Sequence, residues 1–153
     1  MKNIQVQMID SFISSNWWKK IMRHFISINN NFEIRCWNEE EEIKQALMYG
    51  SIFQDCSTTE TSIRGNINED MLNELINAPE PTDKCIYNKM TKYFTINIQN
   101  DMCNICSGHY GTELYIYNVS DDDANIFSEI MFPYRNSFSI YIESSNKLKK
   151  KLL

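Results

Sequence analysis

Glycine, proline and alanine are scarce in this chain, whose 153 residues include only four glycines, three prolines and three alanines. So few glycines leave little room for a loop that cradles a phosphate, and the patterns GxxxxGKS/T, GxGxxG, GxSxG and HExxH are absent. The two histidines, His24 and His109, lie in no motif that joins a nucleophile, a base and an orienting acid. We therefore expect a protein that is not an enzyme and needs no cofactor.

Positive charge is also scarce over most of the chain. Four of the 15 Lys and Arg residues lie in the tail, 147–153, which leaves 11 against 20 Asp and Glu in residues 1–146, a net charge of −9. A field of this sign repels phosphate backbones and attracts cationic surfaces. We expect a cationic protein partner and no direct contact with nucleic acid.

No apolar run approaches the roughly 20 residues that span a bilayer, and the first ten residues lack the apolar core of a signal peptide. We therefore expect a cytoplasmic protein without a membrane partner. In that compartment the odd number of cysteines predicts free thiols. The five cysteines are Cys36, Cys56, Cys85, Cys103 and Cys106.

Aromatic and apolar residues are plentiful, with eight Phe, eight Tyr and three Trp and a hydrophobic share of 42%, so the chain is a folded protein. We expect one α+β domain over residues 1–146, followed by a basic, frayed tail over 147–153. Apolar spacing and capping residues predict four helices. They begin at Ser15 or Asn16, after Asn38, after Asn68 and at Ser120, and end near Phe25, Gly50, Ala78 and Pro133.

Residues that alternate between apolar and polar predict strands at 32–37, 92–99, 113–118 and 137–143, whereas residues 51–66 indicate a loop or a short edge strand. This order favours an antiparallel sheet formed mainly by the C-terminal half, with helices packed on one face. The alternation places one set of side chains towards the helices and three tyrosines on the opposite face. The inner set is Phe94, Ile96, Leu114 and Ile116; the tyrosines are Tyr93, Tyr115 and Tyr117.

These tyrosines suit either of two surroundings: an exposed aromatic patch that anchors a partner, or a second layer that buries them. Two acidic runs are further candidates for partner binding. Each opens a predicted helix, where carboxylates are favoured anyway, and together they predict one acidic face. The runs are Glu39, Glu40, Glu41 and Glu42, and Asp121, Asp122 and Asp123.

Cys103, Cys106 and His109 offer the alternative to a binding protein, namely a metal-binding or thiol-redox module centred on residues 103–109. A zinc site needs a fourth ligand, and no second matched pair of cysteines supplies one. A redox pair of this spacing lies between a strand and a helix, whereas this one lies between two predicted strands. We favour a turn in which the cysteines are small apolar fillers and Gly108 and Gly111 bend the chain.

The acidity, the small size and a composition rich in Ile and Asn, which AT-rich codons favour, form a profile that extends over the whole chain. This profile resembles the immunity proteins of bacterial polymorphic toxin systems, in particular the contact-dependent growth-inhibition type. The resemblance implies a tight complex with a cognate toxin domain, frequently a basic nuclease, that is neutralised by acidic surface complementarity. A third reading is an acidic decoy that mimics nucleic acid.

Overall fold

The computed structural model describes residues 1–10, 13–81 and 88–145, which form an eight-stranded antiparallel sheet with four α-helices. The sheet order is β3-β4-β2-β5-β6-β7-β1-β8. The strands are β1 (Lys2–Met8), β2 (Asn31–Trp37), β3 (Ser51–Phe53), β4 (Glu60–Asn66), β5 (Thr95–Gln99), β6 (Asn104–Gly108), β7 (Glu113–Val119) and β8 (Phe138–Ser144). The helices are α1 (Asn16–Phe25), α2 (Glu42–Ala46), α3 (Glu69–Asn77) and α4 (Asp121–Met131).

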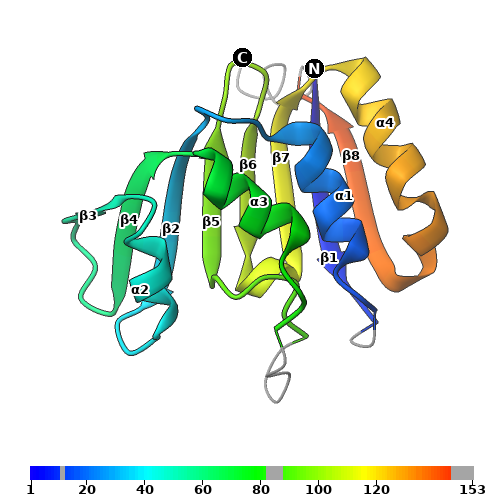
Figure 1. Cartoon of the computed structure of the whole chain (residues 1–153). Helices are drawn as coiled ribbons and strands as arrows, with labels where there is room; N and C mark the ends of the chain where they lie inside the picture. The colour runs from blue at the N-terminus through cyan, green and yellow to red at the C-terminus, as the bar shows by residue number, and fades with distance from the viewer. Residues whose placement is uncertain (11–12, 82–87, 146–153) are drawn as a thin grey trace.

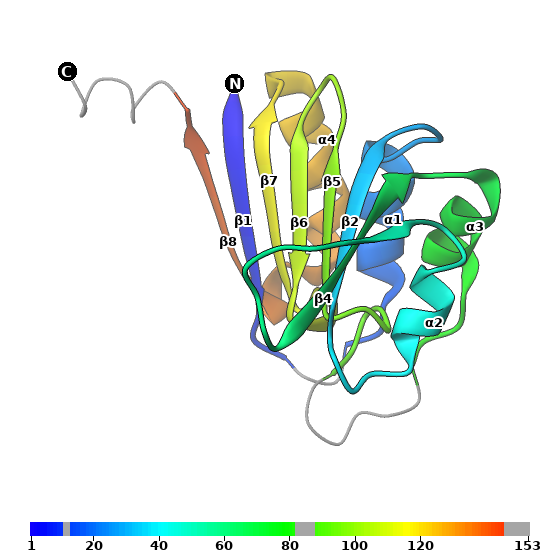
Figure 2. The ribbon, with the colours of Figure 1, turned by 90° about the vertical axis from the view of Figure 1, so that its left-hand side faces the viewer.

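All four helices lie on the same side of the sheet (Figures 1 and 2). The α+β class and the placement of the helices are therefore confirmed. The sheet draws more on the first half of the chain than predicted, because β1 to β4 all lie before residue 67. The predicted tail at 147–153 lies outside the described residues.

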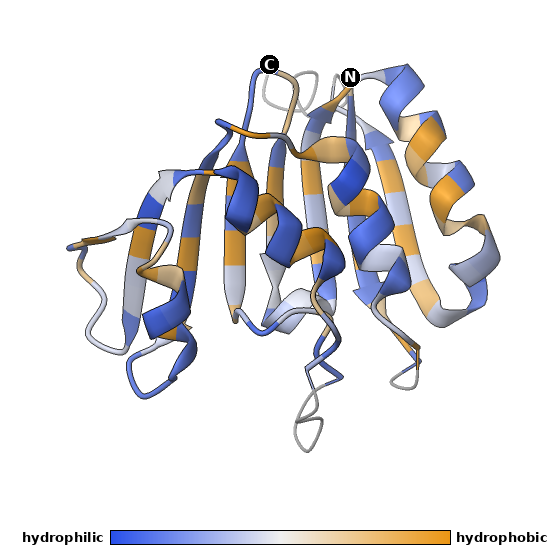
Figure 3. Cartoon of the chain, in the orientation of Figure 1, coloured by the Kyte–Doolittle hydropathy of each residue, from blue (hydrophilic) through white to orange (hydrophobic). Residues whose placement is uncertain are grey.

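The core lies between the sheet and the helices and follows most of the predicted periodicities (Figure 3). The exception is at residues 93 and 94, where Tyr93 is buried in the core and Phe94, predicted to face the helices, is only half-buried. The apolar residues whose spacing predicted α1 are all buried, namely Trp17, Trp18, Ile21, Met22 and Phe25. Asn68 and Ser120 cap α3 and α4, accepting hydrogen bonds from the backbone N–H groups of Met71 and Asp123 at 2.8 and 3.1 Å. Within the described part of the chain, no helix is long and apolar enough to cross a membrane.

Three local predictions were wrong. The second helix does not begin after Asn38, because the Asn38 side chain bonds instead to the carbonyl of Thr58 and to the hydroxyl of Thr61, in the β3–β4 hairpin. Of residues 51–66, predicted as a loop or a short edge strand, residues 51–53 do form a short edge strand, β3, but residues 60–66 form a full strand inside the sheet. Residues 104–108, predicted as a turn, form β6. Gly111 does bend the chain, with φ +86°, whereas Gly108 is extended.

Candidate functional site

The face of the sheet opposite the helices carries polar and aromatic side chains, and within the described residues no layer of secondary structure lies over it (Figure 2). We call it the open face. Strand alternation produces it, since the residues that flank each buried apolar side chain point away from the helices. On β2, for example, Phe32, Ile34 and Cys36 are buried, while Glu33 and Arg35 lie on the open face. The face is a candidate binding surface because it lacks a covering layer.

Glu33 is the centre of a hydrogen-bonded cluster on this face. Its Oε2 accepts hydrogen bonds from the Ser62 hydroxyl at 2.5 Å and from Arg64 Nη2 at 3.1 Å, and its Oε1 accepts one from Asn97 Nδ2 at 3.0 Å. Burial acts to raise the pKa of Glu33, but these hydrogen bonds and the Arg64 charge outweigh it and hold the pKa below its ordinary value. The negative charge of Glu33 is therefore balanced by Arg64 and by hydrogen bonds, and these contacts also fix the orientation of its side chain.

Arg35 and Arg64 hold the neighbouring side chains in place. Arg35 Nη1 lies 2.6 Å from Asp55 Oδ2, which ties the β3–β4 loop to the open face, and 3.2 Å from Glu33 Oε2. The Arg64 guanidinium lies 3.7 Å from the centroid of the Phe53 ring, a cation–π contact. Positive and negative charges alternate here, so this end of the open face is close to neutral.

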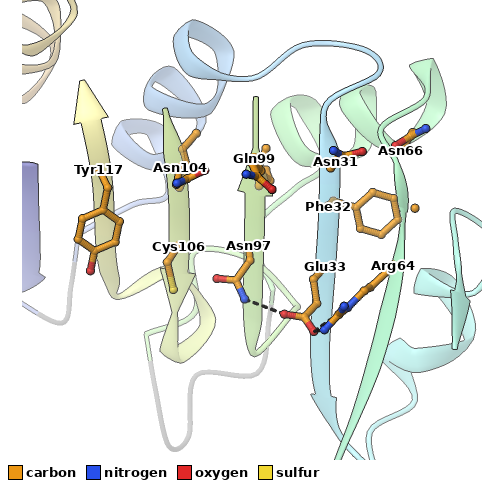
Figure 4. Close-up of a pocket in the computed structure, with 13 residues that line it drawn as sticks. Asn31, Phe32, Glu33, Arg64, Asn66, Asn97, Gln99, Asn104, Cys106 and Tyr117 are labelled. Carbon is orange, nitrogen blue, oxygen red and sulfur yellow. Dashed lines mark hydrogen bonds and ion pairs between the residues drawn. The ribbon is translucent and has the colours of Figure 1, made fainter. Parts of the chain in front are cut away.

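A hollow of about 740 Å³ lies on the open face beside this cluster and extends across five adjacent strands (Figure 4). Its volume falls within the range of small-ligand sites. The walls are mainly amide side chains, with the Glu33–Arg64 pair at one side and Tyr117 at the end (Figure 4). The polar lining side chains are Asn31, Glu33, Arg64, Asn66, Asn97, Gln99, Asn104, Cys106 and Tyr117.

Tyr115 and Tyr117 lie where the alternation predicted, on the open face of β7. Their rings are almost parallel, at 4°, with centroids 6.4 Å apart, and Tyr117 is 44% exposed. Tyr141, across β1 from Tyr115 in the sheet, is also exposed. No second layer buries these rings, so the reading of an exposed aromatic patch agrees with the geometry.

Tyr93 does not belong to this patch, and its prediction was wrong. The strand begins at Thr95, so the period of two does not extend back to Tyr93. Its side chain is instead fully buried on the helix side, and its hydroxyl donates a hydrogen bond to Glu74 Oε2 at 2.7 Å. Burial, reinforced by the Glu74 carboxylate, raises the pKa of Tyr93 well above its ordinary value. Tyr93 is a core residue.

The two acidic runs do not form one acidic face, because α2 and the start of α4 lie at opposite ends of the molecule (Figure 1). In the first run, Glu40 folds back, accepting hydrogen bonds from the Trp37 backbone N–H at 2.9 Å and the Tyr110 hydroxyl at 3.1 Å. In the second, Asp123 pairs with His24 at 2.9 Å and accepts a hydrogen bond from Ser120. Exposed carboxylates remain at Glu39, Glu41, Asp121 and Asp122.

The three candidates for a metal or thiol site are not brought together. Cys103 is buried in the core, whereas Cys106 points to the open face, because residues three apart along a strand face opposite sides. His109 lies at the far end of β6, with its Nε2 3.6 Å from Glu113 Oε2. Burial raises the pKa of the Cys103 thiol to about 11 and also raises that of Cys106. Among the described residues, no group of three His, Cys, Asp or Glu could hold a metal.

Sequence reasoning missed the residues that line the hollow, apart from Tyr117 and Cys106. Glu33 and Arg35 alternate with buried residues on a strand that was correctly predicted, so their side of the sheet could have been inferred. Arg64 and Asn66 could not, since residues 51–66 were read as a loop or a short edge strand. The side of the sheet on which Asn97 and Gln99 lie followed from the alternation. The residues next to them on the adjacent strands could not be inferred.

Comparison of the chain with protein-family models, with curated proteins and with solved structures found no match.

Proposed function

We propose that this protein is an immunity protein that binds and neutralises a cognate toxin domain, and that it does so through the open face of its sheet. One observation carries the choice of surface: in the described part of the chain, the eight-stranded sheet has helices on one face and no layer of secondary structure on the other. A sheet of this width measures about 34 Å across at 4.8 Å per strand, and strands of five to seven residues are about 16 to 23 Å long. The resulting area is comparable with the roughly 800 Å² that each partner contributes to a stable protein complex.

The aromatic rings give this surface the groups that provide most of the affinity in protein complexes. Tyr117 and Tyr141 are 44% and 60% exposed, and Trp37 and Phe53 lie exposed towards the other end of the same face. Tyrosine and tryptophan offer a large contact area with few rotatable bonds, and they are frequent among the residues that dominate binding energy. A patch of such rings is unusual on the surface of a protein that has no partner.

Charge supports a cationic partner. Outside the tail the net charge is −9. The exposed carboxylates Glu39 and Glu41 precede α2, and Asp121 and Asp122 open α4, so they belong to the helical segments and not to the strands of the open face. Carboxylates in such positions increase the rate of encounter more than the final affinity. We therefore expect the association rate to fall as the salt concentration rises, because exposed charges are screened beyond about 10 Å at 0.1 M ionic strength.

The test starts from the genes beside this one, where the proposal predicts that a toxin domain is encoded. Co-expression of this protein with that domain is scored by growth of the host, and the purified pair is titrated by calorimetry. The wild-type chain should restore growth. The double variant Tyr115→Ala with Tyr117→Ala should bind about 700-fold more weakly or worse, since two anchor rings that each contribute about 2 kcal/mol together contribute about 4 kcal/mol. The matched control is Phe132→Ala, which removes an aromatic ring that is 63% exposed next to α4.

The possible failures have different meanings. A wild-type chain that neither binds the toxin domain nor protects the host contradicts the function. Full protection together with unchanged affinity in the tyrosine double variant contradicts the open face as the binding surface. The melting temperature of each variant is measured in parallel, so that loss of binding is separated from loss of folding.

A further inference from the structure

Four amide side chains form a single row across the hollow of the open face. Strand register places Asn31 of β2 between Asn66 of β4 and Gln99 of β5, and Gln99 next to Asn104 of β6. The row continues to Tyr117 of β7, the register partner of Asn104. Figure 4 shows these side chains side by side along one line. Three inter-strand spacings, about 14 Å, separate Asn66 from Asn104, and a fourth brings the distance from Asn66 to Tyr117 to about 19 Å.

The amides of this row have unused hydrogen-bonding capacity. Asn31, Asn66, Gln99 and Asn104 are exposed, and their side chains make no hydrogen bond to any other described residue. Asn97, one row away, is by contrast bonded to Glu33. Each amide offers two donor hydrogens and an acceptor oxygen. The row therefore presents mixed donors and acceptors at a regular spacing, which suits a ligand that carries hydroxyl groups in a regular repeat.

The charges around the hollow narrow the class of ligand further. The amide row carries no charged side chain, and the Glu33 carboxylate beside it is already compensated by Arg64 and by hydrogen bonds from Ser62 and Asn97. Neither an anion nor a cation finds an unpaired opposite charge in this hollow. A neutral polar ligand satisfies the amides without leaving a charge desolvated and unpaired.

Tyr117 closes the row with a flat surface. Its ring is exposed, and the nearly parallel Tyr115 ring beside it limits its orientation. The electron-rich face of an aromatic ring attracts weakly positive C–H groups, such as those on one side of a sugar ring. A pyranose unit in an extended chain is about as long as one inter-strand spacing, so successive sugar units would meet successive amides. The residues of an extended peptide repeat at a shorter distance, so they would not stay aligned with successive amides.

We infer that the amide row, with Tyr117 as its stacking platform, is a binding site for a short neutral oligosaccharide. The amides of Asn31, Asn66, Gln99 and Asn104 bond to sugar hydroxyls, and one sugar ring packs on Tyr117. This site shares the open face and Tyr117 with the proposed toxin-binding surface. It can be tested separately, because a saccharide requires neither a toxin nor the exposed carboxylates.

The test is titration of the purified chain with neutral trisaccharides and tetrasaccharides of β1,4-linked glucose, β1,4-linked N-acetylglucosamine, β1,4-linked mannose and α1,4-linked glucose, followed by NMR and calorimetry. At least one should bind with a dissociation constant of about 1 mM or less. Gln99→Ala and Asn104→Ala should each weaken binding about 10-fold, and Tyr117→Ala should weaken it more. These side chains are exposed, so we expect all three variants to fold.

The matched control is Gln7→Ala, which removes an exposed amide on β1, on the same face but outside the hollow. It should leave saccharide affinity unchanged. The inference is overturned if none of the probes binds at 20 times that concentration, if binding is indifferent to Gln99→Ala and Asn104→Ala, or if Gln7→Ala weakens it equally. Growth protection is measured separately with the same variants, so a failure of saccharide binding and a failure of toxin inhibition are distinguishable.

Discussion

On the covered face of the sheet, Ile34, Ile96 and Ile116 are at most 1% exposed and pack against their cross-strand neighbours and the helices. On the opposite face of the same strands, Glu33, Asn97 and Tyr117 contact one another or solvent. Burial of apolar area therefore stabilises the fold from one side, while the other side contributes a few polar contacts and remains available for binding. Outside the Glu33 cluster, the open face can therefore change with less effect on folding than the covered face.

The largest expected effect comes from the covered face. Ile34 has register partners on both sides, Ile63 and Ile96, and is completely buried. Ile34→Ala should lower the free energy of unfolding by about 3 kcal/mol, through lost burial and the cavity that remains. Tyr115→Ala, on the open face, should lower it by less than about 1 kcal/mol. Urea unfolding of the two variants measures the contrast, and equal losses would mean that the open face is covered in solution.

The variant Glu33→Gln sharpens the comparison, because it measures how much the polar contacts of the open face contribute to the free energy of unfolding. Near pH 7 the change should cost about 2 kcal/mol of unfolding free energy, since charged hydrogen bonds are lost to Arg64 and Ser62. The pKa of Glu33 is lowered by folding, so this stabilisation is present above its ordinary pKa and disappears as the pH falls through the lowered one. The difference between wild type and variant should therefore narrow below about pH 4. A difference that stays constant from pH 7 to pH 3 would contradict the role of the Glu33 charge.

The smallest expected effect on stability distinguishes the buried tyrosine, Tyr93, from the exposed one, Tyr117. Tyr93→Phe should cost about 1 kcal/mol, because a buried hydroxyl loses its hydrogen bond to Glu74. Tyr117→Phe should cost less than about 0.3 kcal/mol, since the Tyr117 hydroxyl is on the exposed side. Thermal unfolding of both variants tests whether Tyr93 is a core residue. Equally small losses of stability in the two variants would mean that the Tyr93 side chain is exposed, like that of Tyr117.

The fold was largely predictable wherever one element carried its own signal. The helix over Asn16–Phe25 and the caps at Asn68 and Ser120 follow from residues within a few positions of one another, and so do the faces of the strand over 113–118. β1 was not predicted, although Ile4 and Val6 alternate with glutamines, because seven residues with so little apolar character are ambiguous alone. β6 was read as a turn because Gly108 and Gly111 were expected to bend the chain, with Cys103 and Cys106 as small apolar fillers.

The candidate site was predictable only in part. Tyr115 and Tyr117 were placed on the correct face by alternation, whereas Tyr93 failed because a regular period was extended past the true start of the strand. The acidic runs were correctly identified as features of the chain, but sequence cannot tell that they lie at opposite ends of the sheet. The amide row could not be predicted from the sequence, since it depends on the register of five strands.

The sequence by itself determined which residues are apolar, where three helices start, which side chains alternate along a strand and the net charge of −9 outside the tail. These properties depend on spacings of two to four residues, which the chain shows directly. Only the tertiary structure decided the strand order, the pairing of β1 between β7 and β8, and the alignment of Asn66, Asn31, Gln99, Asn104 and Tyr117 across five strands. The physical reason is that register is fixed by hydrogen bonds and packing between segments far apart in the chain, and a shift of one residue would exchange the two faces.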